Sequence, residues 1–222
     1  MRRIILMFFL CVAGTLLNVT LHLLTTGEEL LPLYLDTVFT ITVTLLCGPV
    51  WGCLTGALTN IICHTNNFWG WEGYLFALCN IATALVTWQF VRFFPKELNL
   101  VQHQNDTKPS YSVKSRQLDL IMNRIIILTL LSFALCLVIS ILGGLISSFI
   151  EILRFSAGND ILQNPASPPN TQYDRIPLVL REILSRIPIN IIDRLISAFS
   201  GYFIAFALLI LSKKIVYPLA KN

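Results

Sequence analysis

Charged and amide side chains interrupt apolar stretches at several positions of this sequence, and these positions could bind a polar ligand. Asp36 lies within the stretch LYLDTVFTI, and Asp193 with Arg194 lies within INIIDRLIS. A charge at the centre of a bilayer costs at least ~2.5 kcal/mol on insertion scales, so such residues usually face a protein interior or a water-filled cavity. Asp36 could therefore contact a ligand, pair with Arg194, or cap the first turn of a helix.

The sequence gives little support for catalysis, disulfide bonds or metal binding. It contains no HExxH, GxSxG, Walker or dinucleotide-binding motif. The six cysteines occupy apolar runs without a CxxC pair, which is typical of packing residues rather than of disulfides or a zinc site. We therefore expect no enzyme, no catalytic residues, and no metal or cofactor bound by this chain.

The composition indicates which elements must hold these side chains. Hydrophobic residues make up 55% of the chain and charged residues 13%, and the mean hydropathy is +0.71. A soluble domain carries roughly 25% charged residues, and about 20 mainly apolar residues suffice for a helix to cross a bilayer. The sequence therefore predicts an all-α membrane protein, a compact bundle of six transmembrane helices. The expected spans are residues 4–24, 31–47, 49–64, 74–94, 125–153 and 189–211.

The distribution of lysine and arginine predicts the orientation of this bundle. Basic residues gather near both termini and in the connector 95–123, whereas the loops 25–30 and 65–73 contain none. The positive-inside rule then places both termini in the cytoplasm. The net charge of +4 follows from this topology and gives no indication of nucleic-acid binding. Residues 154–188 form an extracytoplasmic loop, in which the apolar spacing of 176–187 predicts an amphipathic helix on the outer surface.

Polar residues of four spans fall at a similar depth in the outer half of the predicted bundle. The stretch HTNNFWGWEGY adds aromatic, amide and acidic side chains from the loop after the third span, although an interfacial aromatic belt would explain its rings equally well. The candidate substrate-binding residues are Asp36, Thr40, Asn60, Asn67, Trp69, Trp71, Glu72, Asn80, Asn190, Asp193 and Arg194. The acids and rings favour a flat or cationic compound.

Small residues recur every four positions in the third span, at Gly48, Gly52 and Gly56, and similar stripes follow Ser132 in the fifth span and Asp193 in the sixth. Membrane helices associate closely through such residues. These stripes therefore predict packing faces.

Two segments carry a resemblance to a known family. In LYLDTVFTITVTLLCGPVWGCLTGALTNII an apolar helix leads into a GPxxGxxxG turn, and IPINIIDRLISAFSGYFIAFALL opens the last helix with Pro188, Asn190 and Asp193. In these features and in the six-span layout the chain resembles the S components of energy-coupling factor (ECF) transporters, which are the substrate-binding membrane subunits of ABC-type importers.

The resemblance implies a multi-pass protein of a prokaryotic cytoplasmic membrane that captures a vitamin-like micronutrient near the outer face. It also implies a transmembrane coupling subunit and two ATPase subunits as partners, with ATP used by those partners. The family commonly carries an AxxxA-type docking patch on its first helix, and residues 4–24 contain no alanine pair at that spacing. A ligand-binding sensor or accessory module without transport is therefore the alternative, and an intramembrane enzyme using Asp36 and Asp193 is a third hypothesis without a supporting motif.

Overall fold

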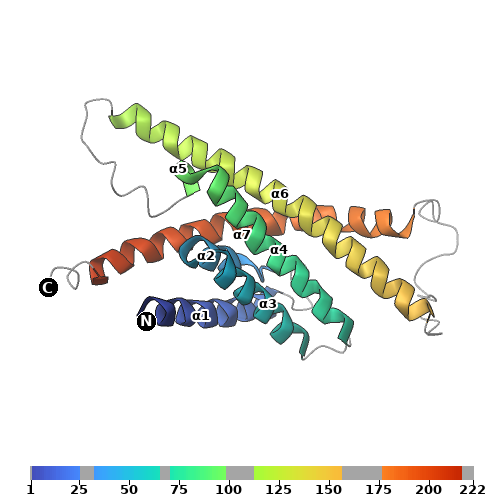
Figure 1. Cartoon of the computed structure of the whole chain (residues 1–222). Coiled ribbons are helices and arrows are strands. Elements are labelled where there is room, and N and C mark those ends of the chain that lie inside the picture. The colour runs from blue at the N-terminus through green and yellow to red at the C-terminus, as the bar shows by residue number, and fades with distance from the viewer. Residues whose placement is uncertain (1, 26–32, 66–70, 99–112, 157–176, 217–222) are drawn as a thin grey trace.

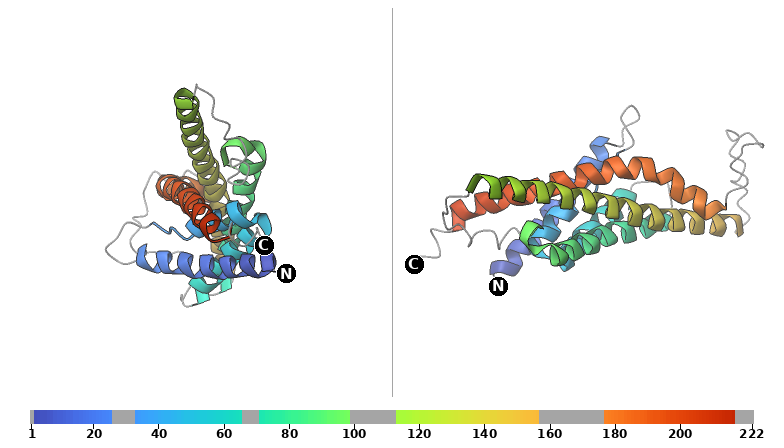
Figure 2. Two further views of the ribbon diagram at one scale, coloured as in Figure 1. Left: turned by 90° about the vertical axis from the view of Figure 1, so that its left-hand side faces the viewer. Right: turned by 90° about the horizontal axis from the view of Figure 1, so that it is seen from above.

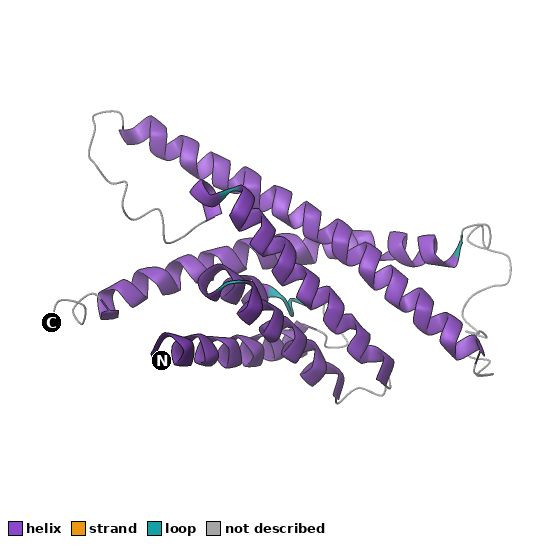
Figure 3. Cartoon of the chain, viewed as in Figure 1, coloured by secondary structure: helices purple, strands orange, loops and turns teal. Residues whose placement is uncertain are grey.

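The computed structural model describes residues 2–25, 33–65, 71–98, 113–156 and 177–216, and all regular structure in these ranges is helical (Figure 3). The helices, in chain order, are α1 (Arg2–Thr25), α2 (Val38–Cys47), α3 (Pro49–Thr65), the 3-10 helix η1 (Trp71–Phe76), α4 (Ala77–Phe93), the short α5 (Pro95–Leu98), α6 (Val113–Ser156) and α7 (Leu178–Val216). Figure 1 shows that α1 begins and α7 ends at the same end of the bundle.

Among the described residues, four helical segments are long and apolar enough to cross a membrane, namely Ile4–Thr25, Glu72–Phe93, Leu118–Leu153 and Leu178–Leu211. Large apolar side chains lie exposed along them, among them Phe9 and Phe149. Outward-facing apolar surface of this kind is suited to lipid. The chain is thus an all-helical protein with the features of a multi-pass membrane protein.

The second predicted span begins later than the sequence indicated. Helix α2 starts at Val38 rather than at residue 31, and it is preceded by a non-helical stretch and a turn at Asp36 and Thr37. Short polar side chains favour turns and helix starts over helix interiors, and Leu35 has a left-handed backbone, with φ of 40°. Asp36 therefore lies in the turn before a helix and not inside one.

The structure shows no break between the predicted outer amphipathic helix and the last span. Residues 178–187 are helical, but α7 continues through Pro188 to Val216 as one helix of 39 residues. Proline is tolerated inside membrane helices where neighbouring helices support the backbone. Here α6 gives that support, because α6 and α7 form the most extensive helix pair and run side by side (Figure 2).

Helix α6 is also longer than the predicted fifth span, since it includes residues 113–123 of the expected connector. The adjacent glycines Gly143 and Gly144 do not interrupt this helix. A Cβ atom at Gly144 would lie 2.9 Å from the backbone nitrogen of Ile183, so glycine permits the close approach of α7. Gly56 has the same function in α3, because a Cβ atom there would lie 2.9 Å from the carbonyl oxygen of Asn80.

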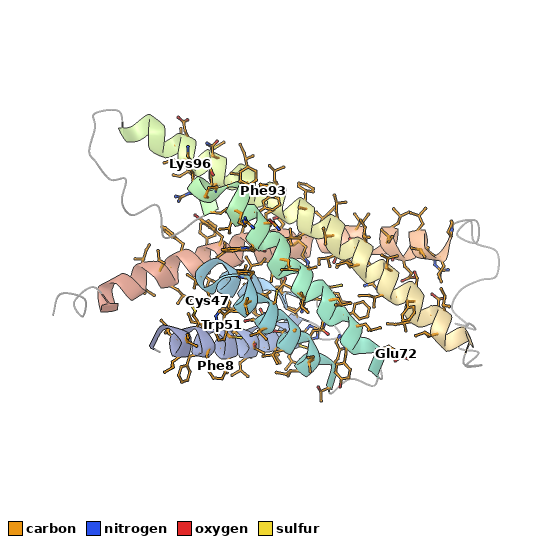
Figure 4. All side chains as sticks on the ribbon, in the orientation of Figure 1. Phe8, Cys47, Trp51, Glu72, Phe93 and Lys96 are labelled. Carbon is orange, nitrogen blue, oxygen red and sulfur yellow. The ribbon has the colours of Figure 1, made fainter. Side chains whose placement is uncertain are left out.

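The buried apolar core fills one part of the bundle. It joins residues of α2, α4, α5, α6 and α7, namely Ile41, Val91, Leu98, Ile127, Leu128, Leu131, Leu135, Ala198, Tyr202 and Ala205. Figure 4 places Glu72 of η1 and Lys96 of α5 beyond opposite ends of α4, with Cys47 and Trp51 near the turn between α2 and α3. On α7, Asp193 and Arg194 come before the core residues Ala198, Tyr202 and Ala205. The charged residues therefore lie on the side of the core nearer the start of that helix.

Candidate functional site: a buried acid, amide and guanidinium cluster

The non-helical segment before α2 is held in place by α7. The backbone N–H of Leu35 donates a hydrogen bond to Asp193 Oδ1 at 3.0 Å. Non-helical backbone at membrane depth is tolerated only where it is buried in protein or lines a water-filled cavity. Asp193, which is fully buried, supplies one of the polar partners that this segment requires.

Arg194 joins this segment to the two acids. Its Nη2 lies 2.8 Å from Asp193 Oδ2 and 3.9 Å from Asp36 Oδ1. Its Nη1 donates a hydrogen bond to Thr37 Oγ1 at 2.6 Å. The Arg194 side chain is 5% exposed, so these are charge-assisted contacts in a dry environment, where each is stronger than in water.

Asp36 receives its hydrogen bond from another helix. Asn80 Nδ2 of α4 donates to Asp36 Oδ2 at 2.9 Å and also approaches the carbonyl oxygen of Gly56 at 3.4 Å. The Asp36 side chain is 14% exposed. The four residues Asp36, Asn80, Asp193 and Arg194, which we call the charged cluster, thus join the turn before α2 to α4 and α7.

A second buried polar group surrounds Asn18 of α1. Asn18 Nδ2 donates to Thr40 Oγ1 at 3.1 Å and to Thr59 Oγ1 at 3.3 Å, and its Oδ1 accepts from the backbone N–H of Phe39 at 2.9 Å. The Phe39 N–H belongs to the first turn of α2, which has no intrahelical acceptor. Asn18 therefore caps α2 from another helix. Sequence reasoning missed this role, although an asparagine in the middle of the first apolar span was the available signal.

The predicted site residues do not all meet. Asp36, Asn80, Asp193 and Arg194 come together, and Asn60 is buried on α3. Thr40 is bound to Asn18 instead, and Asn190 Nδ2 donates to Ser140 Oγ of α6 at 2.9 Å. Glu72 is partly buried within η1. Asn67, Trp69 and the side chain of Trp71 lie outside the described part of the chain.

The chemistry available to the charged cluster is recognition of polar groups. Two carboxylates and one guanidinium give it a net charge of −1 when all three are ionised. Within the described ranges no group of three His, Cys, Asp or Glu side chains could hold a metal ion. The arrangement offers hydrogen-bond acceptors and fixed charges among buried side chains, which are the polar groups that orient a ligand in small-molecule sites.

Comparison with protein-family descriptions, with characterised proteins and with solved structures found no match to this chain. The function is therefore argued from the residues themselves.

Proposed function

We propose that this protein is the substrate-capture (S) component of an ECF-type ABC importer. In this proposal the chain crosses a prokaryotic cytoplasmic membrane six times, keeps both termini in the cytoplasm, and binds a vitamin-like micronutrient near the outer face. A transmembrane coupling subunit and two ATPase subunits complete the importer, and the ATPases hydrolyse ATP. This chain itself carries out no catalysis and binds no cofactor.

The charged cluster is the observation that carries the proposal. Asp36, Asp193 and Arg194 are buried or mostly buried in a chain whose helices otherwise present apolar surface. Ionisable residues in such surroundings usually mark a substrate or ion pathway.

Uptake measurements test this proposal directly. Cells would express the chain with or without a coupling subunit and its ATPases and receive radiolabelled riboflavin, thiamine, biotin or pantothenate. We expect one compound to accumulate only when the chain and the coupling module are both present. The proposal would be contradicted if none of these compounds required the chain for its uptake.

A ligand-binding sensor or accessory module is the second candidate, and the surface of α1 favours it. Most exposed residues of α1 are bulky and apolar, among them Phe8, Phe9, Leu16 and Leu17. The small exposed residues Ala13 and Thr20 are seven positions apart, so this face has no pair of small residues at the spacing of four that permits close helix docking. A sensor would bind a compound in the same panel with unchanged affinity when the coupling module is present, and would not accumulate it.

A further inference from the structure

Asp193 already neutralises Arg194. The guanidinium Nη2 is 2.8 Å from Asp193 Oδ2, a hydrogen-bond distance, but 3.9 Å from Asp36 Oδ1. Its Nη1 is used by Thr37. Since Coulomb attraction falls with distance, the arginine and Asp193 form the closer pair, and Asp36 lies at the edge of the arginine's reach.

Asp36 consequently keeps an acceptor without a hydrogen bond. Its Oδ2 accepts from Asn80, whereas its Oδ1 is buried and has no hydrogen-bond partner. An ionised carboxylate has about four acceptor positions. Leaving such a position unsatisfied inside a protein costs free energy that a bound donor would recover.

Asn60 offers a second acceptor in the same place. Its side chain is 6% exposed, and its Oδ1 is buried without a hydrogen-bond partner. One turn earlier on α3, the Gly56 carbonyl meets the same Asn80 amide that binds Asp36. Asn60 therefore lies one helical turn beyond the α3 carbonyl that shares the Asn80 amide with Asp36.

A second arginine near the start of α7 does not balance the cluster. Arg186 precedes Arg194 by two helical turns, donates a hydrogen bond to Ser147 Oγ of α6, and places its guanidinium carbon 5.5 Å from the centre of the Phe76 ring. Its charge is thus directed toward α6 and η1. Asp36 Oδ1 and Asn60 Oδ1 lack hydrogen-bond partners, as do Asp193 Oδ2 and the Arg194 Nε–H. Acceptors thus outnumber donors among these buried atoms, beside a cluster with a net negative charge.

We propose that the captured substrate is an organic cation with an N–H-bearing positively charged group, and that Asp36 Oδ1 and Asn60 Oδ1 accept hydrogen bonds from it. The inference rests on the proposed capture function and deepens it. A carboxylate and an amide oxygen together match an ammonium, amidinium or guanidinium group, which carries donors and a positive charge. An anionic substrate would instead add negative charge to a cluster that already carries an excess.

Thermal unfolding of the purified full-length protein with a panel of defined charge tests this inference. The cations with a charged N–H group are agmatine and tyramine, the neutral compounds are riboflavin, nicotinamide and tyrosol, and the anions are biotin, pantothenate and 4-hydroxyphenylacetate. Tyramine, tyrosol and 4-hydroxyphenylacetate differ mainly in the charged end of one scaffold. We expect at least one cation to raise Tm in a saturable manner, and no neutral or anionic compound to do so.

Matched variants connect the effect to the site. In Asp36→Asn the new amide oxygen can still accept from Asn80, but the charge is lost, so we expect the affinity for the stabilising cation to fall at least tenfold, about 1.4 kcal/mol. Asn60→Ala should reduce the affinity for the same cation by a smaller factor. Glu151→Gln is the control, because it makes the same change at a carboxylate of α6 that pairs with Arg181 at 3.7 Å, and it should leave the affinity unchanged.

The outcomes separate the two proposals. If only neutral or anionic compounds raise Tm, cation recognition is overturned while substrate capture stands. If no compound of any charge raises Tm, both proposals fail. If a cation stabilises the wild-type protein and both site variants with equal affinity, Asp36 and Asn60 do not bind it and the inference is wrong.

Discussion

At the scale of single residues, Arg194 supplies the positive charge of the charged cluster. Its side chain is 5% exposed, and it contacts both acids of the charged cluster. Removing one partner of a buried ion pair leaves the opposite charge without compensation, at a cost of roughly 3–5 kcal/mol. We expect Arg194→Met to reduce the free energy of unfolding by about that amount, measured by thermal or denaturant unfolding in detergent.

Arg181→Met is the matched control for this prediction. The Arg181 side chain is 41% exposed, and its contacts with Glu151 and Glu182 are 3.7 and 3.8 Å long. Exposed pairs of this kind contribute about 0–1 kcal/mol. Equal losses of stability in the two arginine variants would show that the cluster does not depend on Arg194.

Asn18 gives a second prediction at this scale, independent of any ligand. Replacing it with alanine removes the hydrogen bonds to Thr40 and Thr59 and the acceptor for the Phe39 N–H. Buried groups that lose their partners cost about 1–3 kcal/mol. We expect Asn18→Ala to lower the free energy of unfolding by at least that amount, as denaturant titration in detergent would measure.

Thr20→Ala supplies the comparison for Asn18→Ala. Thr20 is exposed on the same helix, and its hydroxyl bonds only to the Leu16 carbonyl one turn earlier. Stability should therefore change little in this variant. A loss at Asn18 no larger than the loss at Thr20 would rule out the proposed cap on α2.

At the scale of elements, adjacent glycines of α6 make a stringent test of its contact with α7. A Cβ atom at Gly144 would lie 2.5 Å from Ile183 Cγ1 and 2.9 Å from the Ile183 backbone nitrogen, whereas the nearest atom to one at Gly143 would be 3.5 Å away. Overpacking of this kind typically costs 1–3 kcal/mol. We expect Gly144→Ala to lower Tm and Gly143→Ala to leave it unchanged or raise it slightly, because alanine is the better helix former.

The two glycine variants also test the continuity of α7. If residues 178–187 lay apart from α6 as a separate surface helix, Ile183 would not contact Gly144, and both variants would behave alike. Similar Tm values would thus contradict the packing of the first turns of α7 against α6. The two variants need only one unfolding assay in the same detergent.

The helix boundaries show which parts of the fold can be predicted from the sequence. Apolar runs predicted helices at most positions because burial in lipid or protein requires long apolar segments. The start of α2 and the passage of α7 through Pro188 were not predictable, because both depend on contacts from other helices. Proximity of Asp36 and Arg194 was one of three alternatives, and the closer Asp193–Arg194 pair depends on side-chain geometry that spacing does not determine.

At the scale of the whole molecule, the number of membrane crossings depends on α2 and α3. Helix α2 has 10 residues and α3 has 17, about 15 and 26 Å at 1.5 Å per residue. Neither helix alone reaches the ~30 Å of a bilayer interior, and α2 spans only about half of it. The α2–α3 pair could cross a locally thinned membrane, or it could form a re-entrant hairpin that enters and leaves on the same side.

Cysteine accessibility at the turn between these helices distinguishes the two arrangements. Val50 follows the turn at Gly48 and Pro49 and is 67% exposed. In a variant lacking the six native cysteines, Val50→Cys should react with a membrane-impermeant maleimide in inside-out vesicles but not in intact cells. This result follows if α2 and α3 both cross, because the turn then reaches the cytoplasmic surface beside the start of α1 and the end of α7.

Two reference positions calibrate this experiment. Ser167→Cys, in the segment predicted to be extracytoplasmic, should react in intact cells, and Thr107→Cys, in the predicted cytoplasmic connector, only in inside-out vesicles. If both references behave in this way and Val50→Cys reacts from neither side, the α2–α3 pair is re-entrant and the chain crosses four times. Asp36 would then lie in a hairpin that enters from the outer surface, and the charged cluster would still be reached from that side.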